Sequence, residues 1–269
     1  MTELNTQAEN ISGYVALITG GSSGIGFEMA KQLLSQGATV IIAARSGKRL
    51  EDAAAALNAH GYNVHTLPMD VTVEASVSDA AKWVEDHFDH LDMVVNDAGI
   101  GKNAPGMEDL PGDYHFYDIP VSTVRAVIET NFIGYFIVAS KFVPIMLKQG
   151  RGSLVYVSTS TDTMTKPGQL PYGPSKAGAE AMAAIMANEL REMGIMVNVI
   201  CPGGFTDTPM AGKGMKDFFL QNHMPILPPT ILNRTISFLA SPLSNGISGE
   251  KIIGKDFDAW LMNRGITFA

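Results

Sequence analysis

Residues 14–37 read YVALITGGSSGIGFEMAKQLLSQG, an apolar run that leads through a glycine-rich turn into a helical pattern. The apolar run predicts a buried strand, and Ile25, Met29 and Leu33 then recur at helical spacing until a stop signal at Gly37. A glycine-rich turn in this context brings a helix N-terminus close to an anion, which is typical of dinucleotide-binding sites. A purely structural tight turn is the alternative interpretation.

The same alternation of strand and helix continues along the chain. Strand-like runs follow at 38–45, 63–70, 91–99, 153–159 and 195–203, and helical patterns end at Gly61 or lie near 75–88, 121–149 and 172–193. Because no hairpin signal interrupts this alternation, the sequence predicts a parallel sheet covered on both faces. With no linker and no internal repeat, the expected fold is one doubly wound α/β domain over residues 1–269, with about seven strands.

Composition excludes several classes of partner. The 269 residues are 46% hydrophobic and carry a formal net charge of −8, with a pI near 5.2, which argues against nucleic acid or an anionic membrane surface as a partner. The single cysteine, Cys201, cannot form an intrachain disulfide and fits a reducing compartment. No uninterrupted apolar run has the length of a membrane span. We therefore expect a soluble, cytoplasmic protein.

The segment LPYGPSKAGAEAM at 170–182 places Tyr172 and Lys176 four residues apart in a predicted helix, so both side chains share one face. An ammonium beside a phenol favours the phenolate, and we expect it to lower the tyrosine pKa from about 10 toward the working pH. Such a phenol can exchange a proton with a carbonyl and alcohol pair. Most Tyr-x-x-x-Lys pairs are ordinary neighbours on a solvated helix, so the rest of the chain decides the role of this one.

Further short motifs occur along the chain, and their order is informative. They are TGGSSGIG at 19–26, Asp70-Val71, NDAG at 96–99, Asn131 within ETNFIGYF, YGPSK at 172–176 and Pro202-Gly203. In these motifs the sequence resembles the short-chain dehydrogenase/reductase family over nearly its whole length. The family patterns are TGxxxGxG, NNAG, YxxxK and PG, and Asp97 replaces the second asparagine of NNAG. The resemblance implies a Rossmann fold.

The resemblance also implies roles for individual residues. Tyr172 is expected to act as general acid in reduction and base in oxidation, while Lys176 lowers its pKa and holds the nicotinamide ribose. Asn131 is expected to hold a water that relays protons to Lys176. No metal site is predicted. The expected cofactor-binding residues, besides Tyr172 and Lys176, are Gly20, Ser22, Ser23, Gly24, Ile25, Gly26, Asp70, Val71, Asn96, Ala98, Gly99, Pro202, Gly203, Thr206 and Thr208.

A hydroxyl near Tyr172 is expected to bind the substrate oxygen. The family register of thirteen residues before the tyrosine falls on Thr159, and a one-residue bulge after the strand would bring in Ser160 instead. Ser158 is the third candidate, although alternation along a strand points it to the opposite face. Thr159 and Ser160 remain equally favoured.

The end of the second predicted strand reads Ala43-Ala44-Arg45-Ser46 and contains no acid. A carboxylate there would favour NAD, whereas the planar, permanently charged fork of Arg45 suits a 2′-phosphate, with Ser46 as a second donor. Arg45 could also be an ordinary surface residue, and Ser23 stands where some NADP-using relatives carry a basic residue. The predicted cofactor is NADP(H).

Two segments are expected to shape the substrate site. GKNAPGMEDLPGDYHFYDIP at 101–120 has the composition of a loop, and the segment at about 204–230 corresponds to a mobile lid in relatives. The lid is rich in Met and Phe and offers no arginine pair for an anion, which favours a neutral, mid-sized apolar ketone. His115 and His223 are more simply explained as solvated loop residues. KDFDAWLMNRG near the C-terminus has no assigned role.

The predicted function is an NADPH-dependent carbonyl reductase or, in reverse, an alcohol dehydrogenase acting on a small molecule. The alternatives are NAD-linked alcohol oxidation, which makes Arg45 incidental, and a dinucleotide-binding sensor without turnover. Retention of Asn131, Tyr172 and Lys176 argues against the sensor. Apolar and small residues on helices 121–149 and 172–193 predict a homodimer or homotetramer.

Overall fold

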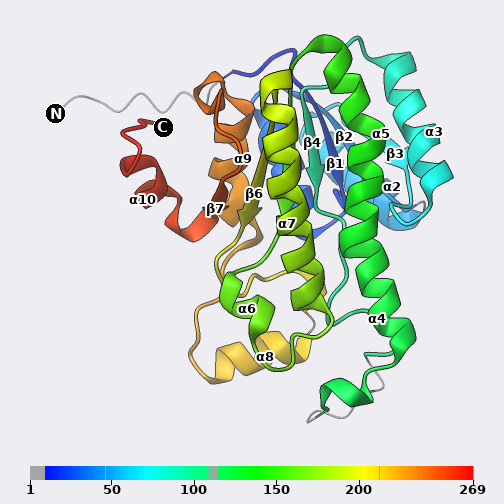
Figure 1. The fold of residues 1–269 in the computed structure, drawn as a ribbon, viewed down its shortest axis with the longest axis vertical. Helices are drawn as coiled ribbons and strands as arrows, with labels where there is room; N and C mark the ends of the chain where they lie inside the picture. Colours follow the sequence, from blue (N-terminus) through cyan, green and yellow to red (C-terminus); the bar gives the residue numbers. More distant parts are fainter. Residues whose placement is uncertain (1–9, 46, 108–109, 111–113, 212, 269) are drawn as a thin grey trace.

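A computed structural model describes residues 10–268 except for positions 46, 108–109, 111–113 and 212 (Figure 1). A seven-stranded, fully parallel sheet runs through it in the order β3-β2-β1-β4-β5-β6-β7. The strands are β1 (Val15–Thr19), β2 (Thr39–Ala44), β3 (His65–Pro68), β4 (Met93–Asn96), β5 (Gly152–Val157), β6 (Ile195–Cys201) and β7 (Lys251–Ile253). The doubly wound fold is confirmed. The strand order reverses direction between β1 and β4, and open α/β sheets bind ligands at the carboxyl ends of strands at such a point.

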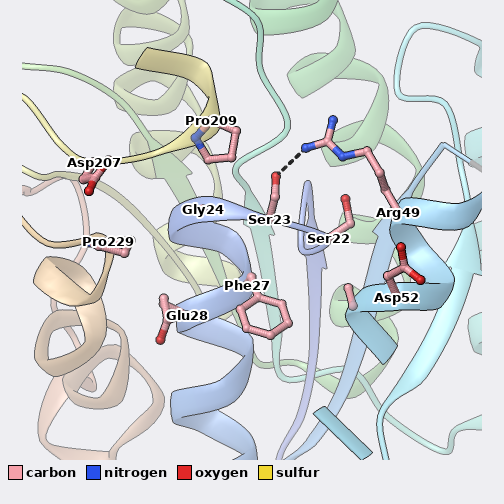
Figure 2. A pocket seen from close by; sticks show the side chains of 11 residues that line it. Ser22, Ser23, Gly24, Phe27, Glu28, Arg49, Asp52, Asp207, Pro209 and Pro229 are labelled. Carbon is pink, nitrogen blue, oxygen red and sulfur yellow. Dashed lines mark hydrogen bonds between the residues drawn. The ribbon is translucent and has the colours of Figure 1, made fainter. Parts of the chain in front are cut away.

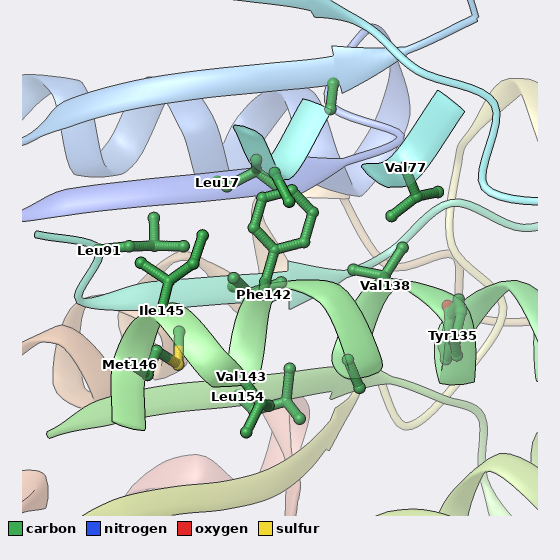
Figure 3. Packing of buried hydrophobic residues seen from close by; sticks show 14 of the residues in the cluster. Leu17, Val77, Leu91, Tyr135, Val138, Phe142, Val143, Ile145, Met146 and Leu154 are labelled. Atoms are coloured by element: carbon green, nitrogen blue, oxygen red, sulfur yellow. The ribbon is translucent and has the colours of Figure 1, made fainter. Parts of the chain in front are cut away.

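Helices cover both faces of the sheet, as alternating side chains on the strands require. Leu17 of β1 packs with α3 (Glu74–His87), α5 (Gly134–Gln149) and α7 (Tyr172–Leu190), and Figure 3 shows Phe142 and Val138 of α5 in this layer. Its neighbours Ala16 and Ile18 face the opposite layer. That layer contains α1 (Gly24–Ser35), α2 (Lys48–Ala59), α9 (Asn233–Ala240) and α10 (Phe257–Met262).

The predicted helix 121–149 is interrupted at Asn131, a predicted site residue. It divides into α4 (Val121–Ile128), a π-helical turn η2 (Glu129–Ile133) that contains Asn131, and α5. Such turns are frequent at functional sites because they shift the register of the side chains that follow. The whole segment is long and apolar enough to cross a membrane, yet half of its most apolar window is buried, as in a core helix. The predicted helix 172–193 ends as a 3₁₀ turn, η3 (Arg191–Met193).

The segment 101–120 is more ordered than its loop composition suggests. It includes the 3₁₀ turn η1 (Phe116–Asp118), and Ala104, Met107 and Ile119 form a small separate core with Val127 of α4. The remaining elements are α6 (Thr161–Thr165), η4 (Pro209–Ala211), α8 (Lys213–Gln221), η5 (Pro229–Leu232), η6 (Pro242–Ser244) and η7 (Gly254–Asp256). α10 shows that most of KDFDAWLMNRG is structural, since Phe257 and Leu261 are buried in the core.

Candidate active site

The glycine turn lies between β1 and α1 and packs directly on the chain that leaves β4. A Cβ atom on Gly20 would lie 2.9 Å from the Cα of Ala98, and one on Gly26 would lie 2.5 Å from Oδ2 of Asp97. Thr19 joins the two segments, because its Oγ1 accepts hydrogen bonds from the backbone N–H groups of Asp97 (3.0 Å) and Ala98 (3.1 Å). Only glycine allows this close approach, so two motifs distant in sequence form one surface.

The N-terminus of α1 has no side-chain cap. Ser23 occupies the N-cap position, but its Oγ accepts a hydrogen bond from Nη2 of Arg49 at 3.0 Å and does not cap the helix. A cavity of about 430 Å³ opens here, lined by Ser22, Ser23, Gly24 and Arg49 among others (Figure 2). An uncapped helix N-terminus with a guanidinium beside it suits the phosphates of a dinucleotide.

Acidic residues also line this cavity, and two of them are already paired. Asp52 accepts from Nζ of Lys48 at 2.7 Å, and Asp207 accepts from Nζ of Lys216 at 2.6 Å. These pairs reduce the repulsion that a bound phosphate would meet. Arg45, the predicted phosphate ligand, is exposed at the end of β2, and its predicted partner Ser46 lies outside the described residues.

The predicted adenine-side residues have structural partners. Oδ1 of Asp70 accepts hydrogen bonds from the backbone N–H (2.9 Å) and the hydroxyl (2.7 Å) of Thr72, which fixes the turn after β3. Val71 is buried and packs against Gly134 at the start of α5. Asn96, at the end of β4, is fully buried, and both polar atoms of its side chain are without a partner among the described residues. Orphaned polar atoms of this kind at the switch point fit a polar ligand nearby.

Tyr172 and Lys176 lie at the start of α7, next to Gly99 and Asn131. A Cβ atom on Gly99 would lie 3.2 Å from Oδ1 of Asn131 and 3.6 Å from Nζ of Lys176, and one on Gly101 would lie 3.3 Å from the Tyr172 ring. The ammonium of Lys176 lies 5.8 Å from the centroid of that ring. The structure therefore brings together the predicted catalytic groups at the carboxyl ends of β4 and β5.

The side chain of Asn131 forms hydrogen bonds with two other segments of the chain. Nδ2 donates to the carbonyl of Ile100 at 2.8 Å and to Oγ of Ser175 at 3.0 Å, and Oδ1 accepts from the Ile100 N–H at 2.9 Å. The side chain thus ties the start of segment 101–120 to α7. Its expected role in holding a water remains a prediction.

The three candidate hydroxyls differ in their partners. Ser158 donates to Oε1 of Glu180 on α7 at 2.5 Å, and Oγ of Ser160 is 2.8 Å from Oγ1 of Thr163 in α6. Thr159 is partly exposed, and its hydroxyl makes no hydrogen bond within the part of the chain that the structure describes. Among the three candidates, Thr159 is the one whose hydroxyl has no partner among the described residues.

Burial, rather than Lys176, dominates the ionisation of Tyr172, which corrects the expectation from the sequence. Burial raises the pKa of Tyr172, and Asp97 raises it further. Burial lowers the pKa of Lys176 to about 8, against the opposing effects of Asp97 and Glu180. Burial likewise raises the pKa of Asp97 to about 7, although Lys176 acts in the other direction. Burial thus keeps the phenol of Tyr172 protonated and opposes the charge on Lys176.

The segment after β6 lies over the glycine turn. Pro202-Gly203 follows the strand, and Thr206 forms a bridge with Leu227 while its Oγ1 donates to the carbonyl of Gly204 at 3.2 Å. The side chain of Thr208 lies 3.4 Å from the position of a Cβ atom on Gly24. Both predicted threonines therefore border the site. His223 and His115 are exposed, as expected for loop residues.

Comparison with known proteins identifies the family. The model of the short chain dehydrogenase family matches residues 14–217. The chain is 30% identical over 256 residues to the uncharacterized oxidoreductase YxjF of Bacillus subtilis, covering 89% of this chain and 95% of that protein. It is also 30% identical over 249 residues to the 3-oxoacyl-[acyl-carrier-protein] reductase FabG of Aquifex aeolicus, covering 90% and 96%. The solved 3-ketoacyl-(acyl-carrier-protein) reductase of Brucella melitensis, complexed with NADH, superposes with a TM-score of 0.79 at 25% identity, covering 90% and 97%.

The chain therefore belongs to the short-chain dehydrogenase family. It is an oxidoreductase, and the family membership supports a pyridine nucleotide as its cofactor.

Two side chains at the site have no counterpart among the predicted residues. Tyr135 of α5 contacts Lys176, and Arg49 of α2 contacts Ser23. The basic cluster Arg45, Lys48 and Arg49 is visible in the sequence and could have indicated the second arginine. For Tyr135 the only local signal is its place four residues after Asn131.

Proposed function

We propose that the protein is an NADPH-dependent carbonyl reductase that acts on neutral, mid-sized apolar ketones and can oxidise the matching secondary alcohols. The observation that carries this proposal is the cluster of Tyr172, Lys176 and Asn131 at the switch point, opposite the uncapped N-terminus of α1. The bound cofactor would supply the hydride. The chain supplies orientation, a proton and exclusion of water.

Each side chain has a defined task in this mechanism. Tyr172 donates its phenolic proton to the carbonyl oxygen as negative charge develops there. Lys176 keeps a positive charge beside the phenol and binds the nicotinamide ribose, and Thr159 donates a hydrogen bond to the same substrate oxygen. Because Tyr172 is protonated in the cofactor-free protein, it is ready to act as an acid without prior proton uptake.

NADP(H) is the proposed cofactor because two arginines lie near the end of β2 and the N-terminus of α1, where we expect the 2′-phosphate. Arg45 is exposed at the end of β2, and Arg49 lies at Ser23 beside the N-terminus of α1. A guanidinium offers paired donors to a phosphate. The strand end carries no carboxylate to accept the two ribose hydroxyls of NAD. NAD-linked oxidation is the alternative, and the solved Brucella melitensis reductase with bound NADH is consistent with it.

We infer that residues 1–269 form one Rossmann domain in which the segment at about 204–230 acts as the lid over the substrate. Met210 lies near Gly99 and Gly101, and Phe219 stacks on Phe205 with centroids 4.1 Å apart. Apolar side chains of this kind suit an irregular hydrophobic ligand. Both rings of this stack belong to the segment 204–230. Phe219 therefore stabilises the conformation of the proposed lid in addition to any contact it makes with substrate.

The proposal includes assembly as a homodimer or homotetramer. Phe136 of α5 and Ile185 of α7 are 52% and 59% exposed, and Ala181 of α7 and Ile133, in the turn η2 just before α5, are exposed as well. Exposed apolar side chains gathered on neighbouring helices indicate a protein contact. Sedimentation at micromolar concentration should show a dimer or tetramer, and a single 28.8 kDa species would contradict this part of the proposal. Cys201 is a buried free thiol, which fits the proposed cytoplasmic location.

The function is tested with a panel of neutral ketones, short keto acids and secondary alcohols, each assayed with NADPH, NADH, NADP and NAD. We expect the largest kcat/KM for an apolar ketone with NADPH. A preference for keto acids would contradict the substrate class, and a preference for NADH would contradict the cofactor. Tight cofactor binding without turnover on any compound would instead support the sensor alternative.

A further inference from the structure

Lys176 is held by a hydroxyl that lies outside the predicted catalytic set. Nζ of Lys176 donates to the phenolic oxygen of Tyr135 at 2.8 Å and to the carbonyl oxygen of Val157 at 2.9 Å. The Tyr135 hydroxyl itself donates to the same Val157 carbonyl at 3.3 Å. The three groups close a small network at the end of β5, which leaves one N–H of the ammonium for a ligand or for Tyr172.

Tyr135 is fixed in this position by its surroundings. It follows the π-helical turn at the start of α5, where Gly134 lets the helix approach Val71. The Tyr135 ring, labelled in Figure 3, is fully buried. It packs edge-on against Tyr156, with ring centroids 5.5 Å apart. Because packing already fixes the orientation of the ring, the hydrogen bond to Lys176 costs little additional conformational entropy.

The hydroxyl acts as a neutral dipole and not as a second acid. Burial raises the pKa of Tyr135 well above its usual value, as do Asp97 and Tyr172, so the group stays protonated. The neutral phenol accepts a hydrogen bond from Nζ of Lys176, and this bond is stronger when Lys176 is a charged ammonium than when it is a neutral amine. Since a buried ammonium is costly unless its donors are bonded, the contact favours the charged form of Lys176.

We propose that Tyr135 is a positioning residue for Lys176, whose hydroxyl holds the ammonium in place and keeps it charged at the pH at which the enzyme works. The effect on charge is a property of the cofactor-free protein. The effect on rate rests on the proposed reductase function.

The other groups that face Lys176 do not replace this contact. Asp97 approaches from the turn after β4, and Tyr172 and Glu180 lie on α7 with Lys176 itself. Glu180 is paired with Lys251 of β7 at 2.8 Å and accepts from Ser158. Removing the Tyr135 hydroxyl leaves these neighbours in place, so the main change is the loss of a hydrogen-bond acceptor for Nζ of Lys176.

The test compares Tyr135→Phe with Tyr156→Phe. Both substitutions remove one oxygen from a fully buried ring of the same cluster, but the Tyr156 hydroxyl contacts Sδ of Met186 at 3.1 Å and not Lys176. The pKa of Lys176 is measured by NMR of cofactor-free protein labelled at lysine Cε, with the signal assigned by its absence in Lys176→Met. We expect a fall of about one pKa unit in Tyr135→Phe and no change in Tyr156→Phe.

Activity gives the second readout. For reduction, kcat/KM should fall at high pH as Lys176 loses its charge. In Tyr135→Phe, but not in Tyr156→Phe, the midpoint of this fall should move to lower pH by as much as the pKa of Lys176 does. An unchanged Lys176 pKa in Tyr135→Phe overturns the proposal, and so does an equal fall in both variants, because it would reflect packing alone. A shifted pKa in a protein without reductase activity would support the positioning role and reject the proposed function.

The wild-type protein provides a measurement that does not depend on the folding of a variant. The Cζ signal of Tyr135 should move at the same pH midpoint as Lys176, because its hydrogen-bond donor changes there. A Tyr135 signal that stays constant through the Lys176 midpoint would overturn the proposal.

Discussion

The cofactor side and the substrate side of the site are built differently. The cofactor side consists of strand ends and helix N-termini that interlock through the backbone, as where Gly20 lies against Ala98 and Thr19 binds the turn after β4. The proposed substrate side consists of segments 101–120 and 204–230, which have small contacts of their own, such as Phe219 on Phe205. A change on the first side disturbs the sheet, whereas the second side can change specificity without affecting the core.

The largest effect is expected on the catalytic acid. Tyr172→Phe should lower kcat by about 10²–10⁴-fold while NADPH still binds, because only the proton donor is lost. Tyr114→Phe is the matched control on the substrate side, since its hydroxyl contacts Lys102 and not the reacting groups. Stopped-flow and steady-state assays of both variants provide the comparison. A wild-type rate for Tyr172→Phe would reject the assigned mechanism.

The next effect concerns the hydroxyl that binds the substrate oxygen. Thr159→Val should lose about 10²–10³-fold in kcat, as expected for removal of an oxyanion donor. Ser160→Ala should remain close to wild type, because Ser160 already pairs with Thr163. If Ser160→Ala is the slow variant and Thr159→Val is not, the bulged register is correct and Thr159 has only a structural role.

Cofactor preference should respond to the two arginines by a smaller factor. Charge-assisted hydrogen bonds contribute about 1.5–3 kcal/mol, so Arg45→Ala and Arg49→Ala should each weaken NADPH binding about 10- to 100-fold and leave NADH nearly unchanged. Lys82→Ala is the control, because Lys82 is exposed on α3, pairs with Asp86 and does not line the cavity. Isothermal titration with each cofactor measures the effect. Equal losses for NADPH and NADH would reject the phosphate assignment.

The smallest effect is expected at the lid. Across neutral ketones, kcat/KM should rise with apolar size, and Phe219→Ala should reduce the difference between large and small ketones about 2- to 10-fold, since an aromatic pair contributes about 0.5–1.5 kcal/mol. Leu220→Ala is the control, because Leu220 is 56% exposed on the same helix. Size preference that survives Phe219→Ala unchanged would place substrate recognition outside the lid.

The sequence predicts the first strand–turn–helix unit and the placement of Tyr172 and Lys176 on one helix well, because these signals are local. A strand, a glycine turn and a helix follow each other in 14–37, and Tyr172 and Lys176 lie on one helical face by spacing alone. Five strands lie within the predicted ranges and β5 begins one residue before its range, while the short edge strand β7 has no long apolar run to indicate it.

Contacts between distant elements are beyond such reasoning. Tyr135 meets Lys176 across 41 positions, and Arg49 meets Ser23 across 26. The π-helical turn at Asn131 has no pattern of its own, although it decides where Tyr135 points. In 101–120 the glycine and proline content conceals the few apolar residues that form a separate core. The pKa of Tyr172 depends on burial, which spacing does not reveal.

The most direct test of the central claim is the transfer of deuterium from NADPH labelled at the nicotinamide C4 to an apolar ketone. Mass spectrometry of the product follows the label in wild-type protein and in Tyr172→Phe. We predict an alcohol that carries one deuterium on its carbinol carbon, formed rapidly by the wild type and about 10²–10⁴-fold more slowly by the variant. Unlabelled product, or no product from any ketone while NADPH binds, would contradict the proposed function.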